Sequence, residues 1–119
     1  GAFMMNIQEL AVANNLDTPI KILIIDNEGY GIIRQTQDAF LGGRHFATDI
    51  GKSPNLPPYD LAKLISAFGI ETKKGNRAEV GTLAEWLFEP GSGHRAVVVS
   101  VDKAAIVEHP PPNNQPLVF

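Results

Sequence analysis

The residues with the clearest chemical potential lie in one short segment, 26–31, which reads Asp-Asn-Glu-Gly-Tyr-Gly. It follows directly after the largely apolar, β-branched segment Ile20–Ile25, which is typical of a strand buried on both faces. Open α/β sheets bind ligands at the carboxyl ends of their strands, so the segment stands where a ligand site is expected. Asn and Gly are equally the standard residues of turns that need a positive φ. Taken alone, the segment leaves a ligand-binding loop and a simple connection both open.

Other reactive residue types form no recognisable site. His45, His94 and His109 lack the i, i+4 spacing of metal ligands, so we expect them in exposed loops. The chain has no cysteine, which excludes disulfides, thiolate zinc sites, iron–sulfur clusters and a cysteine nucleophile. No carboxylates are spaced for acid–base chemistry, and we assign no catalytic residue. Arg34 and Asp38 are four residues apart and are expected to pair on a helix surface.

Charge and hydropathy narrow the classes of partner. The 10 Lys and Arg residues against 13 Asp and Glu residues give a net charge of -3, which provides no broad basic face for nucleic acid. The longest apolar run, Ile22–Ile25, is far shorter than the roughly 20 residues of a membrane span, and the sequence shows no signal peptide. We therefore expect a cytoplasmic protein that binds neither nucleic acid nor a membrane.

The periodicity of apolar residues predicts alternating helices and strands in the order α-β-α-α-β-α-β, a doubly wound pattern whose first strand is missing. We expect a single domain over 1–119 with a three-layer αβα fold and a mostly parallel sheet, incomplete at its N-terminal strands. A long polar loop, 44–58, and a Pro-rich tail, 109–119, lie outside this framework. The predicted helices are Ala2–Ala13, Ile32–Leu41, Asp60–Phe68 and Asn76–Phe88 with Asn76 as N-cap, and the further predicted strands are Ile70–Thr72 and Arg95–Val101.

Five segments, in this order, resemble a known family. They are 1–10 (Gly-Ala-Phe-Met-Met-Asn-Ile-Gln-Glu-Leu), 25–31 (Ile-Asp-Asn-Glu-Gly-Tyr-Gly), 34–37 (Arg-Gln-Thr-Gln), 43–45 (Gly-Arg-His) and 60–69, where Asp-Leu-Ala-Lys-Leu precedes Ala-Phe-Gly. Each is weak evidence alone, but together they cover most of the chain. The sequence resembles the carboxy-terminal, diphosphate-binding domain of thiamine diphosphate enzymes of the acetolactate synthase group.

The resemblance assigns roles to particular residues. In the family, Mg²⁺ is held by the Asp of a Gly-Asp-Gly motif, by an Asn side chain, by a backbone carbonyl two residues later and by the diphosphate. The metal ligands here would be the Asn27 side chain and the Gly29 carbonyl. The start of the first helix would offer free N–H groups to the diphosphate. The residues expected to bind the cofactor are Gly1, Ala2, Phe3, Gly29, Tyr30, Gly31 and Ile32.

The resemblance also implies an activity. The parent enzyme would decarboxylate a 2-keto acid such as pyruvate and transfer the two-carbon carbanion to an acceptor, with thiamine diphosphate as electron sink. The Asp ligand would lie immediately before Gly1, so we expect weakened Mg²⁺ and cofactor binding by this chain and no activity from it alone. Its partner would be the pyrimidine-binding domain of the parent or of a partner subunit. We also expect a homodimer that covers the bare sheet edge.

Three other interpretations remain open. Ile32 and Thr36 stand where acetolactate synthases usually carry Met and Trp, which favours a relative with another acceptor, such as a keto-sugar. A stand-alone, non-catalytic binding or interaction module derived from such a domain would show the same motifs. An unrelated nucleotide-binding α/β domain, in which 27–31 receives a phosphate without magnesium, would share the loop alone.

Overall fold

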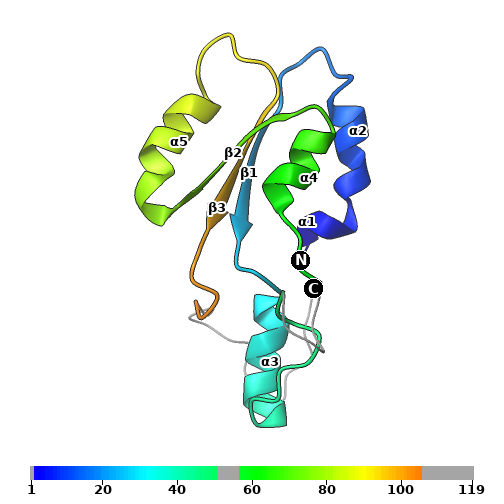
Figure 1. Cartoon of the computed structure of the whole chain (residues 1–119), viewed down its shortest axis with the longest axis vertical. Helices are drawn as coiled ribbons and strands as arrows, with labels where there is room; N and C mark the ends of the chain where they lie inside the picture. The colour runs from blue at the N-terminus through cyan, green and yellow to red at the C-terminus, as the bar shows by residue number, and fades with distance from the viewer. Residues whose placement is uncertain (1, 51–56, 106–119) are drawn as a thin grey trace, which may run out of the picture.

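A computed structural model describes residues 2–50 and 57–105, which contain a three-stranded, fully parallel sheet (Figure 1). The strand order is β1-β3-β2. β1 spans Lys21–Asp26, β2 spans Glu71–Asn76 and β3 spans Arg95–Ser100. Gly1 and the tail 109–119 lie outside the described residues. The parallel α/β architecture predicted from the sequence is confirmed.

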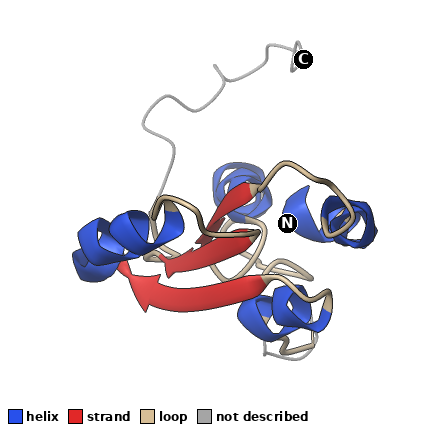
Figure 2. Ribbon diagram, turned by 90° about the horizontal axis from the view of Figure 1, so that it is seen from above, coloured by secondary structure: helices blue, strands red, loops and turns tan. Residues whose placement is uncertain are grey.

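Helices cover both faces of the sheet, as the view from above shows (Figure 2). One face carries α4 (Leu61–Ala67) together with α1 (Ala2–Met5) and α2 (Leu10–Ala13). The opposite face carries α5 (Val80–Leu87). The chain therefore forms a partial three-layer αβα domain. Among the described residues, no helix combines the length and the apolar character that crossing a membrane requires.

The central strand β3 contributes to two separate cores. Successive side chains of a strand point to opposite faces, so Ala96 and Val98 pack on the α4 side, and Val97 and Val99 pack on the α5 side. All four residues are at most 3% exposed. The first core is completed by Leu10, Ile24, Leu61, Ile65 and Ile70, and the second by Leu83 and Leu87.

The prediction of one helix over Ala2–Ala13 is wrong. The segment is divided into α1, a 3₁₀ turn at Ile7–Glu9 and α2. The break lies at Asn6, whose backbone (φ -130°, ψ 25°) leaves the helical region. Asn side chains compete with helical backbone hydrogen bonds, which makes this residue a natural point of interruption.

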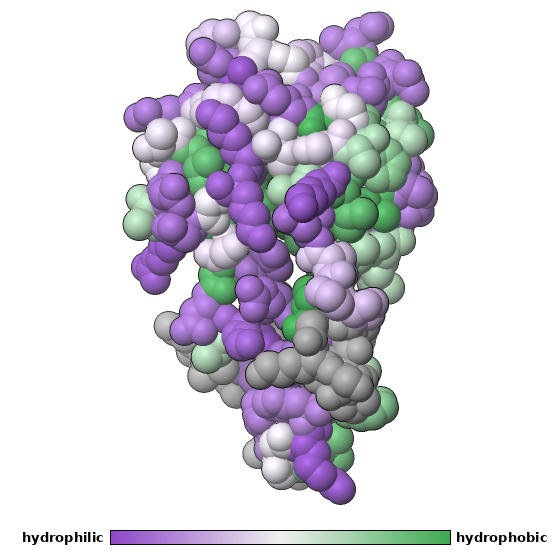
Figure 3. Space-filling model, viewed as in Figure 1, coloured by the Kyte–Doolittle hydropathy of each residue, from purple (hydrophilic) through white to green (hydrophobic). Residues whose placement is uncertain are grey.

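The expectation that β1 is buried on both faces is also wrong. Ile24 packs against the first core and is 6% exposed, but Leu23 and Ile25 are 58% and 60% exposed on the opposite face. The reason is the position of α5, which packs mainly on β2 and β3; Leu23 only lines a groove beside α5 and stays largely exposed. Apolar surface is also visible over α2 and α4 in the space-filling view (Figure 3), and Val12 of α2 is 58% exposed.

β2 is longer than predicted. Its sequence, Glu-Thr-Lys-Lys-Gly-Asn, carries no apolar alternation, because it is an edge strand whose Lys73 and Lys74 remain exposed. The glycine at its fifth position leaves room for α5, since a Cβ atom at Gly75 would lie 2.7 Å from Leu83 Cδ1, which would then have to shift. This close approach of strand and helix gives the second core its tight packing.

The predicted N-cap at Asn76 is confirmed. Its side-chain oxygen accepts a hydrogen bond from Ala78 N at 2.8 Å, and the Glu79 carboxylate accepts one from Asn76 N at 2.9 Å. This capping box starts a 3₁₀ turn, Arg77–Glu79, that leads into α5. The cap thus sets the direction in which α5 returns over the sheet.

We predict that Asn76→Ala lowers the free energy of unfolding by about 1 kcal/mol, because the orphan N–H groups of the first turn lose their acceptor. Urea denaturation measures the change. The matched control is Asn6→Ala, since Asn6 occupies an N-cap position but makes no side-chain cap hydrogen bond. Equal losses in both variants would contradict the assignment of the cap.

Candidate functional site

The carboxyl ends of all three strands lie at one end of the sheet. The parallel register places Asp26 of β1 beside Ser100 of β3, and Asn76 of β2 on the other side of Ser100. After Asp26 the chain turns through 27–30 into α3 (Gly31–Leu41), which projects beyond this end (Figure 1). The segment singled out in the sequence is therefore a loop at the edge of the sheet where open α/β folds bind ligands.

Two adjoining cavities lie beside this loop. The smaller, of about 210 Å³, is lined by residues of the 27–30 loop, by the first three residues of α3 and by Ala2 of α1. Phe3 lines the larger cavity, of about 270 Å³, instead. Only Gly1, among the residues expected to bind the cofactor, lies outside the described residues. The predicted site residues that surround the smaller cavity are Ala2, Asn27, Gly29, Tyr30, Gly31 and Ile32.

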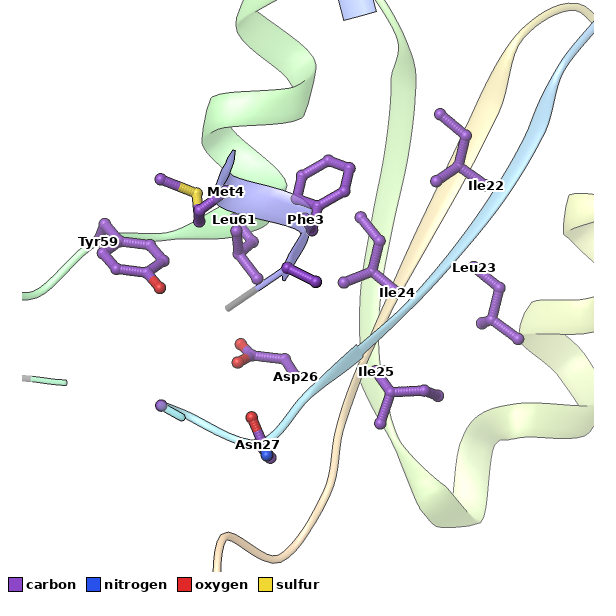
Figure 4. A pocket seen from close by; sticks show the side chains of 12 residues that line it. Phe3, Met4, Ile22, Leu23, Ile24, Ile25, Asp26, Asn27, Tyr59 and Leu61 are labelled. Atoms are coloured by element: carbon purple, nitrogen blue, oxygen red, sulfur yellow. The ribbon is translucent and has the colours of Figure 1, made fainter. Parts of the chain in front are cut away.

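The larger cavity lies between α1, β1 and the start of α4, and its polar side chains are those of Asp26, Asn27 and Tyr59 (Figure 4). The Asp26 carboxylate and the Tyr59 hydroxyl point into it from different segments, against apolar walls that include Ile24 and Leu61. Sequence reasoning gave neither Asp26 nor Tyr59 a role. The position of Asp26 as the last strand residue was a usable signal, whereas no pattern marks Tyr59.

The side chain of Asn27 lies over the start of α3. A Cβ atom at Gly31 would lie only 2.6 Å from Asn27 Nδ2, so a glycine leaves room for this amide. Gly31 is the first residue of α3, and Tyr30 provides no side-chain cap for the helix. Among the described residues, the N-cap position therefore offers no side-chain acceptor to the first N–H groups of α3, which lie next to the Asn27 amide.

Gly29 makes the closest backbone contact at the site. A Cβ atom there would lie 2.1 Å from the Thr48 carbonyl oxygen, so no larger residue fits. Two hydrogen bonds join the segments on either side of this contact: Tyr30 N donates to Thr48 O at 2.9 Å, and Ile50 N donates to Glu28 O at 3.1 Å. The first part of the long polar loop thus packs against the 27–30 loop and holds its backbone in place. The sequence spacing did not predict this contact.

Two ion pairs near the site differ from the prediction. Arg34 does not pair with Asp38: it donates to Asp49 at 2.5 Å, while Asp38 pairs with His45 at 2.7 Å. The long loop supplies a partner to each residue, because Asp49 lies beside the buried Arg34 and His45 lies beside the exposed Asp38. His45 is exposed as expected, but the half-buried His94 accepts a hydrogen bond from Ile20 N at 3.1 Å through its Nδ1.

The oxygen donors at the loop suit a hard cation. Within residues 2–50 and 57–105, no three His, Cys, Asp or Glu residues gather as a self-sufficient metal site. The Asn27 amide oxygen and the Gly29 carbonyl belong to the loop itself, and Asp26 is the one carboxylate that lines either cavity among the described residues. Such a set needs further oxygens from a ligand to complete the coordination of Mg²⁺.

The environment of Tyr59 raises the pKa of its phenol above the ordinary value of 10.0. Burial is the main cause, because it disfavours the phenolate, and the nearby Tyr30 and Asp26 add to the shift. The folded chain therefore prefers the neutral phenol. This preference stabilises the fold below pH 10.0, and the contribution is lost as the pH rises above that value.

We predict that Tyr59→Phe reduces the loss of stability above pH 10.0, because the variant has no phenol to ionise at this cavity. Urea denaturation across the alkaline range measures the effect, and the ultraviolet absorbance of phenolate reports the ionisation itself. The chain has two tyrosines, so the variant also shows which absorbance change belongs to Tyr59. The prediction would be contradicted if the absorbance change above pH 10.0 were as large in the variant as in the unchanged chain.

Comparison with known proteins agrees with this geometry. The family described as "Thiamine pyrophosphate enzyme, C-terminal TPP binding domain" matches residues 1–101. Acetolactate synthase isozyme 2 large subunit of Escherichia coli K12 is 33% identical over 87% of this chain and 18% of its own length. A probable acetolactate synthase large subunit of Methanocaldococcus jannaschii is 35% identical over 62% of this chain and 12% of its own length.

A third relative, acetolactate synthase of Mycobacterium avium, is 38% identical over 66% of this chain and 13% of its own length. The chain thus spans less than a fifth of the length of these relatives. The match to the family nevertheless includes α1, the 27–31 loop and all three strands. The chain belongs to the C-terminal, thiamine pyrophosphate-binding domains of acetolactate synthase-like enzymes.

Proposed function

We propose that this chain binds the diphosphate of Mg-thiamine diphosphate, as the cofactor-binding part of a 2-keto acid decarboxylase or carboligase. The observation that carries the proposal is the smaller cavity, where Ala2 of α1 meets the 27–30 loop and the start of α3. Asn27 and the Gly29 carbonyl would hold the cation, and the backbone around Gly31 and Ile32 would lie against the diphosphate. The start of α3 supports this arrangement, because free N–H groups at a helix N-terminus favour an anion.

The charges around the cavities support a magnesium-dependent mode of binding. Among the described residues, no lysine or arginine lines either cavity, and Asp26 adds a negative charge. A bare diphosphate would therefore meet no cationic side chain in the lining of these two cavities, and Arg34, which lies close to Gly31, is already paired with Asp49. A divalent cation bound by oxygen donors would supply the missing positive charge. This argues against the nucleotide-binding alternative, in which a phosphate is bound without magnesium.

The chemistry divides between the cofactor and the protein. Thiamine diphosphate supplies the electron sink for decarboxylation and carboligation. The residues of this chain bind and orient its diphosphate end, and we assign no catalytic residue among them. A pyrimidine-binding domain, from the parent or from a partner subunit, completes the proposed enzyme. A cytoplasmic location is part of the proposal, since a chain without cysteine suits a reducing compartment.

The uncovered face of β1 supports a protein partner. Leu23 and Ile25 place two large apolar side chains on an edge strand, where unpaired backbone groups also invite pairing. A homodimer that covers this edge is the proposed assembly. The same surface favours the second candidate function, a non-catalytic interaction module derived from the cofactor domain.

We predict that thiamine diphosphate binds to the 119-residue chain only in the presence of Mg²⁺, and that Asn27→Ala weakens this binding at least about tenfold because an oxygen ligand is lost. Calorimetric titration with and without Mg²⁺ measures both effects. Asn15→Ala is the matched control, since Asn15 hydrogen-bonds within its own helical turn, to Ala11 O. A folded chain that does not bind the cofactor would favour the interaction module.

We predict that Gly31→Ala leaves the fold intact but weakens cofactor binding, because the new methyl group displaces the Asn27 amide. The shift of the Asn27 side-chain amide resonance reports the displacement directly. Gly81→Ala in α5 is the matched control, since a Cβ atom there meets nothing within 4 Å. That control is expected to stabilise the fold by about 0.5–1 kcal/mol through helix propensity, without altering the Asn27 resonance.

A further inference from the structure

Arg34 is the one buried charged residue in the described part of the chain. It is 7% exposed, and it is the only residue of α3 in the buried class. A buried charge is costly unless it is paired and hydrogen-bonded. The burial of Arg34 therefore requires partners for its guanidinium group.

The guanidinium of Arg34 joins three segments that are distant in the sequence. Nη1 donates to Asp49 Oδ1 of the long loop at 2.5 Å, and both side chains of this pair are shielded, with 9% and 17% exposed. Nη2 donates to the carbonyl of Lys103, in the segment after β3. Arg34 thus connects α3, the long loop and the exit of the central strand.

One of these partners is directly linked to the proposed magnesium site. Asp49 forms an isolated antiparallel bridge with Gly29, whose carbonyl is an expected metal ligand. The hydrogen bonds of Thr48 O with Tyr30 N and of Ile50 N with Glu28 O flank this bridge. Because the two backbones are in contact at Gly29, a displacement of Asp49 would displace the Gly29 carbonyl.

Other contacts between α3 and the long loop are longer or more exposed. In the part-buried one, Thr48 Oγ1 donates to Gln37 Oε1 at 3.4 Å. Gln37 hydrogen-bonds the backbone of Phe46 at 3.1 Å and 3.2 Å, but these bonds are exposed to water. The pair between Asp38 and His45 is exposed as well, with 57% and 34% of the side chains accessible. Exposed pairs of this kind contribute little, whereas the shielded pair of Arg34 and Asp49 is costly to break.

We propose that Arg34 is a positioning residue that holds the Gly29 carbonyl in the geometry required for the metal, by way of Asp49. One consequence of this role, weaker Mg²⁺-dependent cofactor binding when Arg34 is lost, rests on the proposed function. The structural link from Arg34 through Asp49 to the 27–30 loop does not rest on it, because the hydrogen bonds of Tyr30 N and Ile50 N exist in the chain without cofactor. Amide exchange at these two positions therefore tests the link independently.

We predict that Arg34→Met accelerates hydrogen exchange of the Tyr30 and Ile50 amides at least about tenfold, while the amides of β3 keep their protection. Arg34→Lys, which keeps a donor and the charge, is expected to give a smaller acceleration. Exchange measured by NMR on the 119-residue chain distinguishes these variants. Asp49→Asn reports the same link from the other partner and serves if Arg34→Met does not fold.

The matched control is Arg95→Met. Arg95 also bridges carboxylates and a carbonyl, through Glu71, Glu89 and Trp86 O, but on the α5 side of the sheet. Its loss should leave the exchange of Tyr30 and Ile50 unchanged. Unchanged exchange in the folded Arg34 and Asp49 variants would overturn the proposal, and so would equal acceleration throughout β3. Faster exchange in a chain that binds no cofactor would support the link and reject the proposed function instead.

Discussion

Parallel pairing of β3 with a strand on each side is the constraint on which the other parts of the structure depend. The apolar residues 96–99 are shielded on one face by α4 and its neighbours and on the other by α5, so this strand anchors both cores. Parallel strands must also end at the same edge, which brings the ends of β1, β2 and β3 together. This geometry places the site, because the 27–30 loop follows the last residue of β1 and so begins at this shared edge.

At that edge, the position of the loop depends on contacts between backbones. Gly29 lies against the carbonyl of Thr48, and Gly31 leaves space for the Asn27 amide. Two glycines thus allow two close approaches, one to the supporting loop and one within the site. Arg34 adds the long-range element, since its ion pair with Asp49 fixes the segment on which Gly29 rests. These contacts position the Asn27 amide and the Gly29 carbonyl, and they do so without a cationic side chain in either cavity.

The sequence was most informative where local rules decide the structure. The order of elements, the cap at Asn76 and the loop after β1 all follow from periodicity, capping residues and glycines. It was least informative where distant segments meet. Nothing in the spacing indicates that Arg34 would pair with Asp49 rather than Asp38, or that Tyr59 would enter the cavity beside β1. Likewise, the apolar character of β1 indicated burial, but which faces are covered depends on where α5 packs.

The separation of charges around the loop explains why metal and diphosphate would have to bind together. Arg34 lies beneath the loop, and its positive charge is already matched by Asp49. Asp26 faces the cavity, so the unmatched charge there is negative and would repel a free diphosphate. The same carboxylate attracts a divalent cation, but the few protein donors leave its coordination incomplete. Diphosphate oxygens would fill the remaining positions, and the cation would in turn cancel the repulsion. In the proposed function, each ligand would thus create the conditions for the other. Their binding would be thermodynamically coupled, with the same coupling free energy in both directions.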